Sequence, residues 1–245
     1  MRLIPVLDLR AGVVVDARGG DRRYYRPAVS NLHEGSDPLD WAKKARDAFG
    51  ATELYVADLD AIEGSPIAWE PIEQLARIVP KLWLDPGTRD AHGWERLPKQ
   101  ARLVAGTETL NGSAELKTFV ERLGPTRTVL SLDLREGRPL VAQGSSWTNP
   151  LDPRAIAREA IAQGIEEIVL LDLARVGSNK GTGSLDLLRT LSQEHPLIRW
   201  TVGGGISGRS ELVELAEAGA SAALIGSAWR DGRIKHCEAG GRESV

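Results

Sequence analysis

The chain contains two copies of the same series of short apolar segments, and this internal repeat constrains its fold more than any other feature. Each segment of the first half has a counterpart of similar sequence, in the same order, in the second half. The matched pairs are 4–10 with 129–135, 55–59 with 169–173, and 103–107 with 224–227. A repeat of this kind indicates a fold built from two similar supersecondary units.

Short runs rich in Val, Ile and Leu alternate with longer amphipathic stretches, which is the pattern of parallel strands joined by helices. We predict strands at 2–8, 53–58, 81–85, 102–106, 127–133, 167–172, 199–203 and 222–226. We predict helices at 38–49, 68–79, 113–122, 152–163, 185–194 and 207–218, with Ser113 and Ser207 as N-caps.

The number of strands decides the fold class. Eight parallel strands with intervening helices close into a barrel, so we predict an α/β fold, a (β/α)₈ TIM barrel built from two repeated half-barrels. A single domain is predicted over 1–234, with half-barrels at about 1–124 and 125–234. The segment 235–245 is rich in glycine and charge, and we expect it to be a flexible tail.

Composition and charge argue against several classes of protein. The net charge of −3 does not suit a protein whose main partner is nucleic acid. No apolar run approaches the roughly 20 residues that cross a bilayer, and the N-terminus becomes acidic too early for a signal peptide. We therefore predict a cytoplasmic enzyme. Cys237 is the only cysteine and the four histidines are scattered, so we expect neither a metal site nor a cofactor.

Two aspartates at equivalent positions of the repeat are the first candidates for catalysis. Asp8 and Asp133 each lie in a Leu-Asp-Leu-Arg motif at the end of a predicted strand, where TIM barrels form their active face. Two carboxylates that face each other across a pocket can move protons at neighbouring atoms of a substrate. The alternative is that each one caps a loop or pairs with an arginine. A second repeated pair, Asp58 and Asp172, fits a pocket role or a loop-fixing role equally well.

Glycines after the last two strands of the second half predict a phosphate site. Gly204 and Gly205 follow strand 7, and Gly226 and Ser227 follow strand 8. Glycine lets backbone N–H groups approach an anion closely, and the loops after strands 7 and 8 commonly bind phosphate in such barrels. The sequence therefore predicts a phosphorylated small-molecule substrate.

The first half carries an altered copy of this phosphate site. Its strand-3 loop reads Asp-Pro-Gly-Thr-Arg over 85–89, in which Pro86 has no N–H to donate and Asp85 repels an anion. Arg89 could compensate with a bidentate contact, and Gly106 and Thr107 follow strand 4. We therefore predict Arg89, Gly106 and Thr107 as a second, weaker phosphate site.

Two loops of the predicted active face carry further candidates for substrate contact. Trp147, in the loop after strand 5, could stack on a flat part of the substrate or simply pack in its loop. Arg22 lies in a long basic loop after strand 1, which could close over an anionic substrate or remain a solvated run of charge.

Taken together, these motifs resemble the histidine-biosynthesis barrel family, which comprises a ribotide isomerase and a cyclase. The likeness covers about 4–230, and its Ile-Pro opening is more similar to the isomerase branch. The motifs that carry the resemblance lie at 4–9, 12–15, 132–135, 203–206 and 225–227. The resemblance implies a barrel that converts an aminoaldose ribotide to its aminoketose by an Amadori rearrangement, without metal, organic cofactor or obligate protein partner.

The resemblance also implies roles for individual residues. Asp8 would be the general base that takes the proton from sugar C2, and Asp133 a second carboxylate that contacts the substrate. Trp147 matches a tryptophan that stacks on the substrate, and Arg175 matches the arginine of the strand-6 loop. One phosphate would contact Gly204, Gly205, Gly226 and Ser227, and the other would contact Arg89, Gly106 and Thr107.

Two positions depart from the pattern of the family. The family carries its general acid in the strand-6 loop, where this chain has Val176, which cannot donate a proton. Loss of a general acid lowers a rate by roughly 10² to 10⁴. The family also has three glycines where this chain reads Asp85-Pro86-Gly87. Asp133 and Asp172 are the candidates for a replacement acid.

Four functions remain open at this point. The first is a ribotide isomerase of the histidine pathway. The second is a divergent barrel enzyme that acts on another phosphorylated metabolite, for which Tyr25-Arg26-Pro27 resembles a branch linked to methanopterin-dependent one-carbon metabolism. The third is a non-catalytic binder of a phosphorylated ligand, and the fourth is a cyclase with a glutaminase partner.

Overall fold

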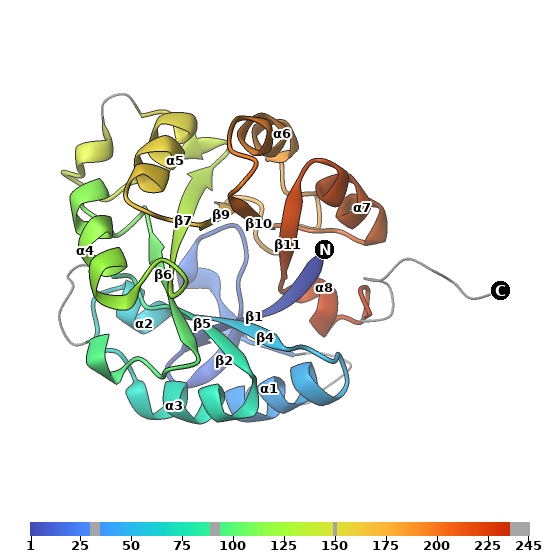
Figure 1. Cartoon of the computed structure of the whole chain (residues 1–245). Helices are drawn as coiled ribbons and strands as arrows, with labels where there is room; N and C mark the ends of the chain where they lie inside the picture. The colour runs from blue at the N-terminus through green and yellow to red at the C-terminus, as the bar shows by residue number, and fades with distance from the viewer. Residues whose placement is uncertain (30–34, 89–93, 149–150, 236–245) are drawn as a thin grey trace.

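The structure, a computed structural model, describes residues 1–29, 35–88, 94–148 and 151–235. They form a closed ring of parallel strands surrounded by helices (Figure 1). In ring order the strands are β1 (Arg2–Arg10), β4 (Glu53–Asp58), β5 (Lys81–Asp85), β6 (Ala101–Gly106), β7 (Thr128–Arg135), β9 (Glu167–Asp172), β10 (Arg199–Gly203) and β11 (Ala220–Ile225). Because β11 pairs with β1, the ring has no open edge. The predicted (β/α)₈ TIM barrel is confirmed, with each strand within two residues of its predicted bounds.

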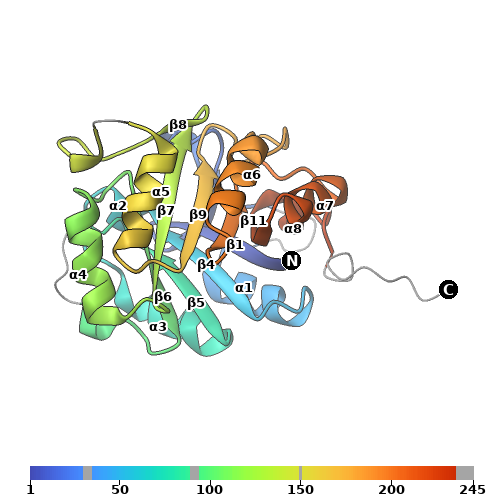
Figure 2. The ribbon, with the colours of Figure 1, turned by 45° about the horizontal axis from the view of Figure 1, so that its top comes forward.

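The predicted helices lie on the outside of the ring (Figure 1). They are α1 (Pro38–Asp47), α3 (Trp69–Ile78), α4 (Ser113–Leu123), α5 (Pro153–Ala162), α6 (Leu185–Glu194) and α7 (Arg209–Glu217). Several short elements were not predicted from the sequence. These are β2 (Val13–Asp16), β3 (Arg26–Pro27), β8 (Arg138–Pro139), α2 (Leu59–Ile62), α8 (Ser227–Arg230), and the 3₁₀ turns η1 (Arg22–Tyr24), η2 (Trp94–Arg96) and η3 (Ser146–Thr148). β8 extends past the end of β7 as a small hairpin (Figure 2).

The helix starts follow local capping rules, with two exceptions to the prediction. Asp37 and Asp152 cap α1 and α5, and each accepts two backbone N–H bonds just before a proline at the first helical position. The prediction that Ser113 and Ser207 are N-caps was wrong. α4 already begins at Ser113, and the Ser207 hydroxyl instead donates to the Glu211 carboxylate, so glycines precede both helices.

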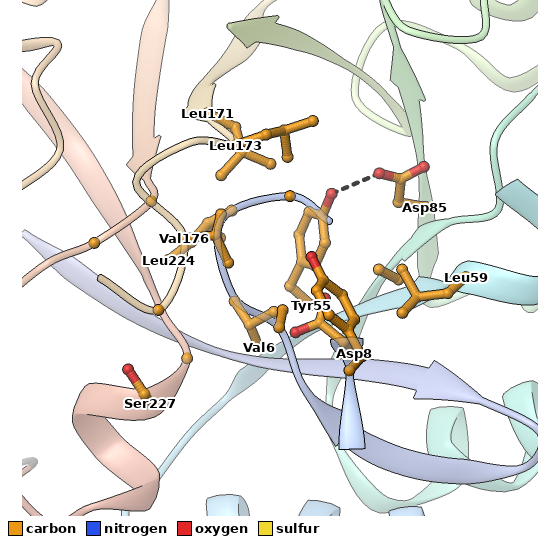
Figure 3. Close-up of a pocket in the computed structure, with 18 of the residues that line it drawn as sticks. Val6, Asp8, Tyr55, Leu59, Asp85, Leu171, Leu173, Val176, Leu224 and Ser227 are labelled. Atoms are coloured by element: carbon orange, nitrogen blue, oxygen red, sulfur yellow. Dashed lines mark hydrogen bonds between the residues drawn. The ribbon is translucent and has the colours of Figure 1, made fainter. Parts of the chain in front are cut away.

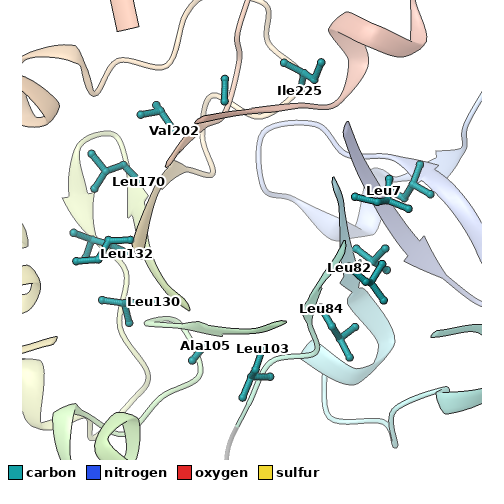
Figure 4. Packing of buried hydrophobic residues seen from close by; sticks show 14 of the residues in the cluster. Leu7, Leu82, Leu84, Leu103, Ala105, Leu130, Leu132, Leu170, Val202 and Ile225 are labelled. Atoms are coloured by element: carbon teal, nitrogen blue, oxygen red, sulfur yellow. The ribbon is translucent and has the colours of Figure 1, made fainter. Parts of the chain in front are cut away.

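Two apolar layers pack on the two faces of the ring. Alternation along each strand sends one set of side chains inward, among them Tyr55, Val104 and Val169, and the inner ends of this layer reach the cavity in Figure 3. The other set, such as Leu7, Leu103 and Leu170, points outward to the helices (Figure 4). Both layers are almost completely buried, so the barrel is a packed core that positions residues only at its two ends.

Charged residues close the amino-terminal end of the barrel. Glu167 is 1% exposed and bonds both Arg2 at 2.7 Å and Arg102 at 2.6 Å. The Arg102 guanidinium lies 4.4 Å from the centre of the Trp83 ring, and the Trp83 indole donates to Glu53 at 2.8 Å. We call these five residues the barrel floor. The floor leaves the carboxyl end of the strands as the end at which the inner layer opens into a cavity.

The described chain has no helix with the length and apolar character needed to span a membrane. Residues 236–245, which make up nearly all of the predicted tail, lie outside the described residues.

Candidate active site

A cavity opens at the carboxyl end of the strands, with about 930 Å³ of empty space that includes its open mouth. Both halves of the barrel contribute to it: Asp8 and Asp85 come from the first half, and Asp133, Gly205 and Ser227 from the second. In Figure 3, Ser227 and Asp85 lie on opposite sides of the view, with Asp8 and Tyr55 between them. The structure thus brings together residues that are up to about 219 positions apart in the sequence.

Strand register explains why Asp8 and Asp85 face the same space. Asp8 pairs with Ala57 across β1 and β4, and Ala57 pairs with Asp85 across β4 and β5. Residues in one register layer of parallel strands point to the same side, so both carboxylates point inward. The small Ala57 side chain between them leaves room for a ligand.

Asp8 has the electrostatic character of a general base. Burial raises its pKa to about 6, although the charges of Arg230 and Arg22 act in the opposite direction. Its carboxylate forms no hydrogen bond with the described residues, and it lines the cavity. At neutral pH Asp8 is therefore mostly ionised and free to accept a proton from a ligand.

Asp133 has the character of a general acid. It is 3% exposed, and burial together with the charges of Glu108 and Asp85 raises its pKa well above the usual value. It accepts hydrogen bonds from the Ser131 hydroxyl at 2.7 Å and from the Glu108 N–H at 3.2 Å. Asp8 and Asp133 therefore hold their protons differently, which is how a pair of carboxylates divides acid and base roles.

One end of the cavity is acidic, lined by Asp85 and Glu108 from the first half and by Asp133 from the second. Burial and the Glu108 charge raise the pKa of Asp85 to about 6. The Tyr55 hydroxyl donates to Asp85 at 2.9 Å (Figure 3). Arg22, from the loop after β1, pairs with Glu108 at 2.5 Å and is the cation that faces this end. Sequence reasoning missed Tyr55, although its place two residues before the inward Ala57 predicts that it also points inward.

The second half forms a glycine-rich end, lined by Gly204, Gly205, Gly226 and Ser227. Gly204 and Gly205 have φ of +92° and +81°, and a Cβ on either would lie 2.6 Å from a backbone oxygen. Glycine is therefore required in this turn by both space and conformation. Among the described residues, the N–H groups of Gly205 and Ser227 have no hydrogen-bond acceptor. They remain free to bind an anion.

Sequence reasoning missed a guanidinium beside the glycine-rich end. Arg233 donates to Ser227 at 3.2 Å, to the Ser207 carbonyl at 2.8 Å and to Asn179 at 2.7 Å. It lies beyond the last predicted strand, in a segment without a motif, so no sequence signal pointed to it. Arg233 also lies 3.3 Å from the Asp231 carboxylate, so the guanidinium beside the glycine-rich end belongs to an ion pair.

The structure does not bring Asp172 or Arg175 into the cavity. The Asp172 carboxylate accepts N–H bonds from Glu136, Gly137 and Ala174 at 2.8–3.1 Å, which fixes the β7–β8 hairpin to the end of β9. With Arg175 it lines a separate depression on the surface. Its prediction as a catalytic acid is corrected to an anchor of loops, because its lone pairs already accept these bonds.

Trp147 also lies away from the cavity. It is 2% exposed, belongs to the outer apolar layer, and its indole N–H donates to Glu159 of α5 at 2.9 Å. A buried indole needs such a partner, and Glu159 supplies it. In this structure Trp147 packs its loop against a helix, which is the second of the two roles that the sequence left open, and stacking on substrate stays a prediction.

The predicted phosphate site of the first half is filled by the protein itself. The Thr107 hydroxyl donates to the Leu140 carbonyl at 2.8 Å, and its N–H donates to Ser131 in the neighbouring strand. A Cβ on Gly106 would lie 2.9 Å from the Asp133 carboxylate, so this glycine makes room for Asp133. Arg89 lies outside the described residues. Gly106 and Thr107 thus help to position a carboxylate, and the second phosphate site stays a prediction.

Val176 lines the cavity in place of a proton donor. Its carbonyl accepts the Gly19 N–H at 2.8 Å, so the loop after β9 holds the loop after β1 over the site. Among the described residues, no group of three or more His, Cys, Asp and Glu side chains has the arrangement of a metal site.

Comparison with known proteins agrees with this architecture. The family described as "Histidine biosynthesis protein" matches residues 2–235. An isomerase of Thermomicrobium roseum, named for 1-(5-phosphoribosyl)-5-((5-phosphoribosylamino)methylideneamino) imidazole-4-carboxamide, is 30% identical over 96% of this chain and 94% of its own length. The isomerase of the same name from Thermus thermophilus is 30% identical over 98% of both chains. An uncharacterised protein of Methanocaldococcus jannaschii is 27% identical over 95% of this chain and 94% of its own length.

Proposed function

Because this chain belongs to the histidine biosynthesis protein family, we propose that it is an isomerase that moves protons on a phosphorylated small molecule by acid–base chemistry of the aldose–ketose type. The observation that carries the proposal is the pairing of Asp8 and Asp133. Both come from equivalent strands of the two halves and both line one cavity. Their different protonation gives a base and an acid in the same space.

The phosphate of the substrate is assigned to the glycine-rich end. The free N–H groups of Gly205 and Ser227 can each donate to a phosphate oxygen, and Arg233 adds a charge beside them. A phosphate held at this end fixes one terminus of the substrate. The rest of the molecule then extends toward Asp8 and Asp133, which raises the effective concentration of the reacting carbon at the base.

The chemical step follows from these assignments. The ionised Asp8 removes the proton from the carbon next to the anomeric carbon, while the protonated Asp133 supplies a proton to the sugar oxygen as the ring opens. The enol or enolamine that results takes a proton at the former anomeric carbon from the now protonated Asp8, while its hydroxyl gives a proton back to Asp133. The product is therefore an isomer of the substrate, and both carboxyls return to their starting states. Asp133 takes over the acid role for which Val176 is unsuited.

The acidic end of the cavity favours a substrate other than the histidine-pathway ribotide. The names of the isomerase relatives contain two phosphoribosyl groups, and hence two phosphates. Asp85, Glu108 and Asp133 line the position opposite the glycine-rich end, and like charges there repel a second phosphate. We therefore assign the chain to a divergent branch that acts on a different phosphorylated metabolite.

Proton exchange with solvent tests the proposal without requiring that the substrate be identified first. A mixed pool of sugar phosphates and ribotides is incubated in D₂O with the protein, and mass spectrometry records which compounds gain one deuterium. We expect exchange with the wild-type protein and at least about a 10²-fold slower exchange with Asp8→Asn. Asp186→Asn, an exposed aspartate on α6, serves as the control.

Three results would contradict the proposal in whole or in part. Equal exchange by the wild-type protein and Asp8→Asn removes Asp8 as the base. Stabilisation of the protein by a phosphorylated compound without any exchange or turnover favours a non-catalytic binder. Turnover of the histidine-pathway ribotide at an ordinary enzymatic rate would show that the chain is an isomerase of that pathway and does not require a different substrate.

A further inference from the structure

We propose that the acidic end of the cavity binds an amino group of the substrate, so that the substrate is a phosphomonoester with one phosphate and an amine at its far end. The inference rests on the proposed function, because it assigns the substrate class of the same cavity.

The acidic end of the cavity has an excess of negative charge, which favours binding of a cation. Asp85 is 8% exposed and Asp133 is 3% exposed, so both carboxyls lie in a space with little water to screen them. Glu108 adds a third carboxylate, and its partner Arg22 is the only cation that faces the group among the described residues. Because Asp133 holds its proton, the ionised Asp85 and Glu108 together with Arg22 leave the group a net charge of −1, which an ammonium ion balances.

The backbone donors that would bind a phosphate here are already used. The Gly87 N–H donates to Asp85 at 3.2 Å, and the Glu108 N–H donates to Asp133 at 3.2 Å. The Thr107 N–H donates to the Ser131 carbonyl at 2.9 Å. In the second half, the N–H groups of Gly205 and Ser227, which match those of Gly87 and Thr107 in the repeat, have no acceptor among the described residues. The two halves share one architecture but present opposite chemistry: free donors at one end and excess acceptors at the other.

The acceptor capacity of the group exceeds the donors within the protein. An ionised carboxylate has about four lone-pair sites, so Asp85 and Glu108 offer about eight, and the protonated Asp133 carboxyl adds further acceptor capacity. The protein donors are the N–H groups of Gly87 and Glu108, the hydroxyls of Tyr55 and Ser131, and the Arg22 guanidinium. An ammonium group supplies up to three further donors.

The middle of the cavity matches an uncharged body between the two ends. Leu59 and Ile62 of α2 line it on one side, and Leu173 and Val176 line it on the other. Apolar walls exclude water and strengthen the charge-assisted bonds made at each end. The cavity therefore suits a molecule with an anionic terminus, an apolar or flat centre and a nitrogen terminus.

Three matched probes test this assignment directly: 6-aminohexyl phosphate, hexyl phosphate and hexane-1,6-diol bisphosphate, each with shorter and longer homologues. Calorimetry at neutral pH measures their affinity for the full-length protein, with inorganic phosphate as the reference. At the best chain length we expect the amino compound to bind about tenfold or more tightly than the alkyl phosphate, because one charge-assisted hydrogen bond gives an effect of this size. The bisphosphate should bind no more tightly than the alkyl phosphate.

Two variants test whether the carboxylates of the acidic end cause the preference for the amino compound. Asp85→Asn and Glu108→Gln should each reduce the preference for the amino compound by about threefold or more, and leave the affinity for inorganic phosphate unchanged. Glu121→Gln, an exposed glutamate on α4, is the matched control and should change neither value. Glu108 is partly exposed, so Glu108→Gln still provides the test if Asp85→Asn does not fold.

The outcomes separate this inference from the proposed function. A bisphosphate that binds more tightly than the amino compound overturns the inference, as does an amino preference that persists in both variants. Equal binding of all three probes, together with Asp8-dependent exchange, overturns the inference alone. If Mg²⁺ binds the wild-type protein and both variants lose it, the acidic end is a metal site and the amine assignment is wrong. Absence of phosphate binding and of exchange would overturn the proposed function as well.

Discussion

At the scale of single residues, the buried carboxylate of Asp8 lowers the free energy of unfolding of the protein when it is ionised. Burial raises its pKa in the folded state to about 6, above the ordinary value of an unfolded aspartate. Below about pH 4 both states are protonated and the residue has no effect on stability. Between about pH 4 and 6 the unfolded state gives up its proton first, so stability falls as the pH rises. Above about pH 6 Asp8 is ionised in both states, and its full destabilising effect on the folded state remains.

Asp8→Asn should therefore be more stable than the wild-type protein at about pH 8, by roughly 1–2 kcal/mol. The amide keeps the shape of the side chain and removes the buried charge, while proton exchange is lost. Thermal unfolding should show a Tm that is higher by about 2–6 °C at about pH 8, and little difference at about pH 4. A lower Tm at the higher pH would mean that the carboxylate stabilises the fold through bonds to neighbouring groups.

At the scale of elements, the sequence predicted what depends on local pattern and failed where contacts are distant. The eight strands and six long helices follow from periodicity within each segment. The inward placement of Asp8 and Asp133 follows from strand alternation. For Asp172 the sequence left a pocket role and a loop-fixing role equally open, and it could not decide between them because the donor Glu136 is 36 residues away in a hairpin with no clear signal. For Trp147 it left stacking on substrate and packing in the loop equally open, because the partner Glu159 lies on the next helix.

Asp172→Asn tests the revised role of this residue at the joint between β9 and the β7–β8 hairpin. An amide replaces one acceptor oxygen with a donor that faces backbone N–H groups, so we expect a loss of about 1–3 kcal/mol in the free energy of unfolding. Deuterium exchange by the remaining folded protein should stay within about fivefold of the wild-type rate, whereas loss of a general acid lowers a rate by about 10² or more. Denaturant unfolding and exchange, measured beside Asp186→Asn, separate the two roles. If Asp172→Asn is as stable as the wild-type protein but catalyses no deuterium exchange, Asp172 acts as a catalytic acid.

At the scale of the whole molecule, the floor at the amino-terminal end of the barrel contributes to stability, and the cavity at the carboxyl end forms the candidate active site. Burial alone would raise the pKa of Glu167, but the charges and hydrogen bonds of Arg102 and Arg2 outweigh it and lower the pKa. Its contribution to stability is therefore present above its unfolded pKa and is lost as the pH falls through the lower folded value. The cavity at the other end contains carboxyls whose pKa is shifted upward, because burial and the charges of neighbouring carboxylates raise it.

Glu167→Gln should destabilise the protein by about 3 kcal/mol or more, because it leaves Arg102 buried without its carboxylate partner. Glu166→Gln is the matched control. Its carboxylate is largely exposed and lies 3.4 Å from Arg199, so its loss should cost less than about 1 kcal/mol. Denaturant unfolding gives both values, and the affinity for inorganic phosphate should be unchanged in each variant. Equal stability of the two variants would show that the floor is not a structural ion network.

The pairing of β1 with β11 has a consequence for biosynthesis. During translation β1 is made long before the partner for one of its edges, which spans Ala220–Ile225. Until that segment is made, the nascent half-barrel has an unpaired edge that can bind other chains. The ring is therefore completed only after β11 has been synthesised, and until then one edge of the first half stays exposed.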